Sequence, residues 1–300
     1  MINTRDRLQK EFKMKSSELN PTEFDYLGMK IKFEQDDNAF LISQPGMIKD
    51  VTEGILDTMD TPCDLKLYQE KDPRPFEDVT LFRSELMKTS YLSKTRPDIK
   101  VAIGFLSTKM QEPTTGDWDK LLRIKKYLNG TRDFVMRVKP VDKIQVYASS
   151  DASFGPYKDG KSNTGMVVTV GTPNAPVIAK SSKQKVVTNS STTAELVAFS
   201  STLEEVLWMV ELLNELGISQ DTVSIEQDNQ STMTLIEKGP SSTGRTKWLN
   251  IKYFWVNEHL RKGAFDMKYV PSLELLADGL TKPLGRKAFC QWRARILNFK

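Results

Sequence analysis

The stretch KIQVYASSD, residues 143–151, decides the fold of the second half of the chain. Its apolar residues Ile144, Val146 and Ala148 alternate with those of a second face, which includes Asp151. A two-residue period of this kind predicts a strand with one face against a core. We therefore expect a strand that ends by presenting an aspartate at one edge of a sheet.

Further strands and helices are predicted on both sides of a long central helix. TGMVVTVG and APVIAK have the composition of two strands, which with the first form an antiparallel meander. The long helix has Ser190, Ser191 and Thr192 as N-cap candidates, and Gly217 ends it. A fourth strand in TVSIEQD leads to a short helix that ends at Gly239, and WLNIKYFWVNEHL forms another helix. AFDMKYV is a fifth strand, and a last helix begins near Ser272.

This order predicts an α/β fold with a mixed five-stranded sheet and flanking helices, formed by residues 140–300. Strand–helix–strand crossovers require parallel neighbours. Residues 1–139 form a smaller α+β region. It contains a charged helix over about residues 3–13, a hairpin made of YLGMKIKF and AFLISQ, and helices near residues 44–56, 81–92, 98–110 and 117–128. The Asp36–Asp37 pair belongs to the hairpin turn, where aspartate is expected for backbone reasons.

Four acidic residues lie on four different elements of the second region. Asp151 and Asp228 end strands, Glu195 lies early in the long helix, and Asp278 lies in the last helix. Alone, each is explained as a helix cap or a surface charge. Together they suit a two-metal site that cleaves phosphodiesters, because divalent cations take oxygen ligands and need several carboxylates to offset their charge. We expect them to meet at the carboxyl ends of the strands.

Composition and charge agree with a globular protein that binds a polyanion. The chain has 300 residues, of which 39% are hydrophobic and 27% charged, and no apolar run approaches the roughly 20 residues of a membrane span. Cys63 and Cys290 are interpreted as free thiols, and the single histidine, His259, excludes a multi-histidine metal site. Basic residues are concentrated in residues 121–139 and after Asp278, which favours phosphate binding at a formal net charge of +4.

The order Asp, Glu, Asp, Asp on these elements resembles the ribonuclease H fold. The surrounding sequence is similar to copia-type LTR retrotransposon polyproteins in SDASFG, SNTGMVVTVG, AKSSKQKVVTNSSTTAELVAFS, EVLWMVELLNELG, QDNQST, GRTKWLNIKYFWVNE and LLADGLTKPL. In the first half, FDYLGMKIKF with LISQ, TRPDI and DWDKLLRIKKYLNGT resemble the end of a reverse transcriptase palm and its thumb. The resemblance covers nearly the whole chain.

This resemblance implies a ribonuclease H, which hydrolyses the RNA strand of an RNA–DNA hybrid. Two Mg²⁺ ions, with Mn²⁺ as an alternative, would be held by Asp151, Glu195, Asp228 and Asp278. RNA would be distinguished by its 2′-hydroxyl groups. The candidate substrate contacts are Ser153, Gln230 and Ser231 beside the metal ligands, and Lys183, Lys185, Asn189 and Arg245 for phosphates. Partners would be the hybrid and the rest of the polyprotein, in the cytoplasm or in virus-like particles, with access to the nucleus and no membrane.

Departures from the family pattern leave alternatives open. The YxDD motif of the polymerase should precede residue 1, so we expect no DNA polymerisation by this chain alone. Trp248 and Asn250 stand where the family often has His and Asp, and VPSLELLAD lacks the helper histidine of cellular ribonucleases H. A non-catalytic nucleic-acid-binding remnant of a decayed or domesticated element is therefore the second hypothesis. A third, an integrase or transposase, normally places its acidic residues in a different order.

Overall fold

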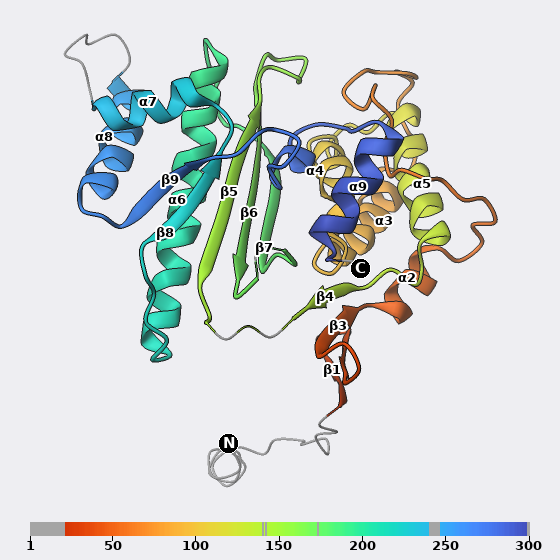
Figure 1. Cartoon of the computed structure of the whole chain (residues 1–300). Coiled ribbons are helices and arrows are strands. Elements are labelled where there is room, and N and C mark those ends of the chain that lie inside the picture. Colours follow the sequence, from red (N-terminus) through yellow and green to blue (C-terminus); the bar gives the residue numbers. More distant parts are fainter. Residues whose placement is uncertain (1–21, 140, 142, 173, 240–246, 299–300) are drawn as a thin grey trace, which may run out of the picture.

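The protein is shown in Figure 1 as a computed structural model, which describes residues 22–139, 141, 143–172, 174–239 and 247–298. The expected helix over residues 3–13 lies outside these ranges. Among the described helices, none is both long and apolar enough to cross a membrane.

A mixed sheet of five strands forms the second region. The strands are β5 (Val146–Ser153), β6 (Asn163–Val170), β7 (Ile178–Lys183), β8 (Val223–Gln227) and β9 (Phe265–Tyr269), in the order β7-β6-β5-β8-β9. The first three form the antiparallel meander, whereas β8 runs parallel to β5 and β9 parallel to β8. The ribonuclease H-like sheet predicted from the sequence is therefore confirmed, with β5 at its centre.

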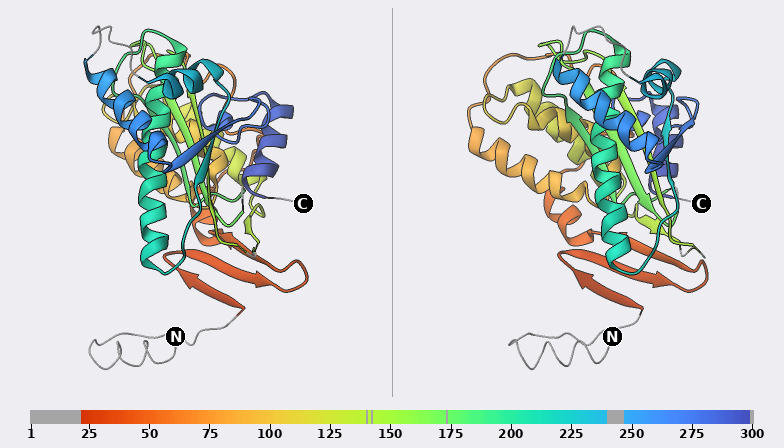
Figure 2. Two further views of the ribbon diagram at one scale, coloured as in Figure 1. Left: turned by 60° about the vertical axis from the view of Figure 1, so that its left-hand side comes forward. Right: turned by 90° about the vertical axis from the view of Figure 1, so that its left-hand side faces the viewer.

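The long helix α6 (Ser191–Glu215) covers one face of this sheet (Figure 2). Ser190, one of the three predicted candidates, is the N-cap: its side chain accepts a hydrogen bond from the backbone N–H of Thr193. Phe199 and Leu203 of α6 and Ile225 of β8 are fully buried in the core between helix and sheet. Helix α7 (Gln230–Lys238) follows β8, and α8 (Lys247–Arg261) lies against α6.

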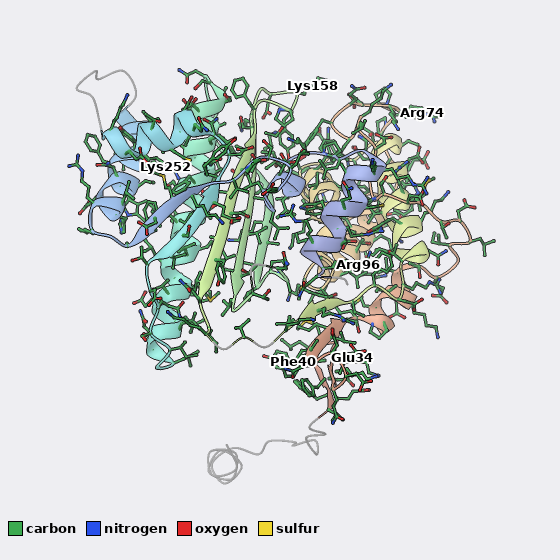
Figure 3. The ribbon with its side chains drawn as sticks, viewed as in Figure 1. Glu34, Phe40, Arg74, Arg96, Lys158 and Lys252 are labelled. Carbon is green, nitrogen blue, oxygen red and sulfur yellow. The ribbon has the colours of Figure 1, made fainter. Side chains whose placement is uncertain are left out.

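The first region combines a small antiparallel sheet with helices. Its strands, in spatial order, are β1 (Glu23–Tyr26), β2 (Met29–Glu34), β3 (Ala39–Ser43) and β4 (Met136–Val138). Its helices are α2 (Pro45–Val51), α3 (Val79–Leu92), the 3₁₀ turn η1 (Pro97–Ile99), α4 (Lys100–Ser107) and α5 (Thr115–Gly130). Arg96, labelled in Figure 3, lies in this region fully buried and paired with Asp98 at 2.7 Å.

Two of these strands, β1 and β4, were not predicted. YLGMKIKF looked like one strand, but Leu27 and Gly28 adopt positive φ angles of 49° and 72° and turn the chain between β1 and β2. Strand β4 is three residues long, too short for its alternation to be recognised. The Asp36–Asp37 pair lies in a turn between β2 and β3, as predicted.

The prediction of a last helix carrying Asp278 was wrong. Asp278 begins a one-turn 3₁₀ helix, η2 (Asp278–Leu280), and the last α-helix, α9 (Arg286–Ile296), starts only after Pro283. Proline cannot continue a preceding helix, which explains the break. In Figure 1, α9 lies beside the helices of the first region rather than on the sheet.

Helix α9 joins the larger of the two main hydrophobic cores. Phe289, Trp292 and Ile296 are buried there with helices of the first region, and the Phe289 ring meets Tyr127 of α5 edge-on at 5.7 Å between centroids. The division of the chain between residues 139 and 140 stays a prediction. This core contains residues from both sides of that boundary.

Candidate active site

Three aspartates from distant parts of the chain meet at one edge of the large sheet. In the parallel pair of β5 and β8, Ser149 lies opposite Glu226, so the register places Asp151 and Asp228, two residues further on, side by side. Asp278 on η2 joins them, and one carboxylate oxygen from each lies within 4.8 Å of the other two. Asp151 lies within β5, which continues to Ser153, and not at its last residue as predicted.

Glu195 reaches the same place from helix α6. It is the fifth residue of the helix and only 5% exposed. The backbone N–H of Ala152 donates a hydrogen bond to its carboxylate, and Gln227 Nε2 donates another at 3.4 Å. An open cleft of about 550 Å³ is lined by Asp151, Glu195 and Asp228.

Each aspartate has a polar partner that the sequence analysis did not assign. Thr281 Oγ1 donates to Asp151 Oδ2 at 2.5 Å, and Ser272 Oγ donates to Asp228 Oδ2 at 2.5 Å. The Lys282 ammonium lies 2.6 Å from Asp278 Oδ1 and also lines the cleft. Thr281 and Lys282 stand in LLADGLTKPL, so the motif itself was a signal that these two residues belong to the site.

Crowding of buried carboxylates raises their pKa values. Burial, together with the charges of Asp151 and Asp228, raises the pKa of Glu195 from 4.5 to about 9. Burial also raises the pKa of Asp151 from 3.8 to about 6, although the hydrogen bond from Thr281 opposes the shift. Burial raises the pKa of Asp278 as well, against the effect of Lys282. Such a cluster is poorly suited to holding several negative charges without cations.

The donor set fits divalent metal ions. Asp151, Asp228 and Asp278 bring carboxylate oxygens together, and Glu195 lines the cleft with Asp151 and Asp228. Hard cations such as Mg²⁺ prefer ligands of this kind. His259 does not reach the cleft. Its Nδ1 lies 2.9 Å from the carbonyl oxygen of Trp255 on its own helix, and its ring packs on Trp255 at 4.6 Å between centroids.

The predicted substrate contacts divide into two groups. Gln230 and Ser231 are exposed and line the cleft beside Asp228. The others on the described part of the chain are not among the residues that line it. Ser153 pairs with Asn163 in the sheet, Lys183 forms an ion pair with Asp159 at 2.8 Å, Lys185 is exposed, and Asn189 accepts a hydrogen bond from Thr193. Arg245 lies outside the described residues.

The basic run over residues 121–139 does not form a free basic surface within the described chain. Four of its basic residues form ion pairs with other parts of the chain, some of them at the surface: Lys125–Glu85, Lys126–Asp57, Arg137–Asp37 and Lys139–Asp37. In the C-terminal run, Arg286 pairs with Asp60 at 3.1 Å, and Arg295 donates to the carbonyl oxygen of Leu273. The expectation that both runs serve phosphate binding stays a prediction, and these residues would have to exchange their present partners for a phosphate.

The large sheet is ribonuclease H-like, and carboxylates gather at the ends of its central parallel strands. These two features define the fold class of this protein as ribonuclease H-like. No protein-family model matches the chain. The retrovirus-related Pol polyprotein from transposon RE2 of Arabidopsis thaliana is 34% identical over 220 residues, which are 73% of this chain and 15% of the relative. The corresponding polyprotein from transposon TNT 1-94 of Nicotiana tabacum is 30% identical over 299 residues, 94% of this chain and 22% of the relative.

The chain belongs to the family of retrovirus-related Pol polyproteins from copia-type transposons, and it spans less than a quarter of the length of these relatives. Among solved structures, the foamy viral protease-reverse transcriptase dRH in complex with double-stranded DNA matches 83% of this chain and 38% of its own. The identity is 12% and the TM-score 0.49.

Proposed function

We propose that this chain hydrolyses the RNA strand of RNA–DNA hybrids as part of a retrotransposon reverse transcriptase polyprotein. One observation carries the proposal: Asp151, Asp228 and Asp278 converge within 4.8 Å at the edge of a ribonuclease H-like sheet, with Glu195 in the same cleft. Polyproteins of this family supply the biological setting.

The four carboxylates would hold two Mg²⁺ ions, or Mn²⁺ in their place. Bound there, the ions would supply Lewis-acid activation of a water molecule and charge stabilisation of the leaving 3′ oxygen. The raised pKa values of Glu195 and Asp151 support this assignment, because positive charge in the cleft favours the ionised carboxylates and relieves their repulsion.

Neighbouring side chains hold these carboxylates in place before substrate arrives. Thr281 fixes one oxygen of Asp151, and Ser272 fixes one oxygen of Asp228. Gln227 reaches in two directions: its Nε2 donates to Glu195, and its Oε1 accepts from the backbone N–H of Asp228 at 2.8 Å. Carboxylates oriented in this way need little reorganisation during the reaction.

Substrate recognition is assigned to the start of helix α7. Gln230 and Ser231 face the cleft next to Asp228, where a hydroxyl and an amide can exchange hydrogen bonds with ribose 2′-hydroxyl groups. Lys185 and Asn189 are exposed on the segment that leads to α6 and are proposed as phosphate contacts outside the cleft. Lys183 must exchange Asp159 for a phosphate to take part.

A labelled RNA–DNA hybrid tests the function, with single-stranded RNA and double-stranded DNA as controls, in Mg²⁺ and in EDTA. We expect metal-dependent cutting of RNA in the hybrid only. Asp228→Asn should lower the rate by at least about a hundredfold, since metal-assisted charge stabilisation contributes several kcal/mol. Asp266→Asn, on strand β9, changes the net charge equally and is the matched control.

The same experiment decides between the proposed enzyme and a non-catalytic binding remnant. Hybrid binding that survives in Asp228→Asn while cutting disappears supports the enzyme. Tight binding by the wild-type chain without any cutting, also in a longer polyprotein that includes the polymerase core, would refute the proposal in favour of the remnant.

A further inference from the structure

Residues 277–282, which carry Asp278, lie between the large sheet and the first region of the chain. Thr281 is completely buried there. The hydroxyl of Tyr68, which precedes Thr281 by 213 positions, donates a hydrogen bond to its backbone carbonyl oxygen at 3.0 Å. A residue of the first region thus contacts the segment that supplies one of the four site carboxylates.

The hydroxyl of Thr281 contacts two of the site aspartates. Its Oγ1 lies 2.5 Å from Asp151 Oδ2 and 2.9 Å from the carbonyl oxygen of Asp278. Its backbone carbonyl also accepts a hydrogen bond from Asn163 Nδ2 at 3.1 Å. The position of Thr281 therefore determines where the Asp151 carboxylate is held relative to the 3₁₀ turn that begins at Asp278.

Aromatic packing fixes the position of the Tyr68 hydroxyl. The Tyr68 ring meets Phe105 of α4 at 5.5 Å and Tyr157 at 5.1 Å between centroids, both edge-on. The Tyr157 hydroxyl in turn donates to Asn163 Oδ1 at 3.0 Å, so both groups that donate to Thr281 belong to one connected cluster. Burial raises the pKa of Tyr68, which keeps its hydroxyl protonated and able to donate.

We propose that Tyr68 is a positioning residue of the nuclease site, through which the first region of the chain holds Thr281 and thereby Asp151 and Asp278. The inference rests on the proposed nuclease function for its catalytic meaning. The first region would then help to build the metal site itself, in addition to any role in holding the nucleic acid. A chain cut near residue 140 would lose this support together with the core that buries α9.

Hydrogen–deuterium exchange in Tyr68→Phe tests the positioning directly and needs neither metal nor substrate. The substitution keeps the ring and its packing and removes only the hydroxyl. We expect amides of residues 277–282 to exchange about two- to tenfold faster, the effect of losing one neutral hydrogen bond. Tyr91→Phe is the matched control, because its hydroxyl donates to the carbonyl oxygen of Leu27, far from the site. Unchanged exchange in Tyr68→Phe would overturn the proposal.

Calorimetric titration with Mg²⁺ then tests whether Tyr68 acts through Thr281. Tyr68→Phe should weaken Mg²⁺ binding about two- to tenfold in the wild-type background. In Thr281→Val, which lacks the hydrogen bond to Asp151, the same change should have little further effect, since effects that share one path are not additive. Equal, additive losses in both backgrounds would contradict the path through Thr281. Absence of cutting by the wild-type chain, also in a longer polyprotein that includes the polymerase core, would refute the nuclease and leave the exchange result valid.

Discussion

Replacing Glu195 by glutamine should stabilise the metal-free chain at neutral pH. Glu195 is 5% exposed, and its pKa is raised from 4.5 to about 9. Between these values the folded chain binds a proton that the unfolded chain has released, so stability falls as pH rises from 4.5 toward 9. Glutamine has nearly the same shape and carries no ionisable group, so the variant does not lose stability in this way as pH rises.

The size of the effect follows from the same linkage. Near pH 7.5 the carboxyl is about three pH units above its unfolded pKa, and each unit corresponds to about 1.4 kcal/mol, which gives a gain of up to about 4 kcal/mol for Glu195→Gln. Near pH 4.5 the gain should fall below about 1 kcal/mol. Asp151, whose pKa is raised from 3.8 to about 6, also makes the folded chain less stable as pH rises, over a lower pH range and in both proteins.

Urea denaturation in EDTA at several pH values measures this prediction. The stability of the wild-type chain should decline with rising pH, whereas that of Glu195→Gln should decline less. Saturating Mg²⁺ should reduce the advantage of glutamine, because cations favour the ionised carboxylate. The reasoning would be refuted if the variant were less stable than wild type at pH 7.5 in EDTA, or if its advantage were the same size at pH 4.5.

Three further substitutions test other parts of the account. Lys282→Met removes an ammonium 2.6 Å from Asp278 and should tighten Mg²⁺ binding about two- to fivefold, measured by calorimetry. Lys262→Met is the control, and weaker Mg²⁺ binding in Lys282→Met would contradict the prediction. Arg96→Met leaves Asp98 in the core without its ion-pair partner and should lower the free energy of unfolding, measured in urea, by about 3–5 kcal/mol. A loss below about 1 kcal/mol would contradict this prediction. Gly165→Ala places a methyl group 2.7 Å from the carbonyl oxygen of Ala277 and should lower the free energy of unfolding by about 1–3 kcal/mol and reduce hybrid cleavage. Gly46→Ala is the control, because no atom of the described residues lies within 4 Å of the added methyl group, and equal effects of the two substitutions would contradict the prediction.

The large sheet could be predicted because its signals are local. Alternation in residues 143–151 and the cap at Ser190 identified β5 and α6, and the chain order then required parallel neighbours. The same logic placed Asp151 beside Asp228, as the register shows. Strands β1 and β4 escaped notice because a positive φ angle at Leu27 divides one apparent strand, and because β4 becomes a strand only by pairing with β3.

The parts of the site that were missed depend on tertiary contacts. Nothing in the sequence indicated that Thr281 would donate to Asp151, 130 positions away, or that Tyr68 would reach Thr281. The predicted last helix was wrongly taken to include Asp278, which begins a short 3₁₀ turn, whereas α9 starts only after Pro283. Charge counts also could not show which residues of the basic runs form ion pairs within the chain.

The most direct measurement of the central claim is an anomalous diffraction map of crystals soaked in Mn²⁺. We expect manganese density bounded by carboxylate oxygens of Asp151, Asp228 and Asp278, with Glu195 at its edge, and loss of this density in Asp228→Asn. Density elsewhere in the molecule, or no density in the cleft at saturating Mn²⁺, would contradict the assignment of these four residues to one metal site.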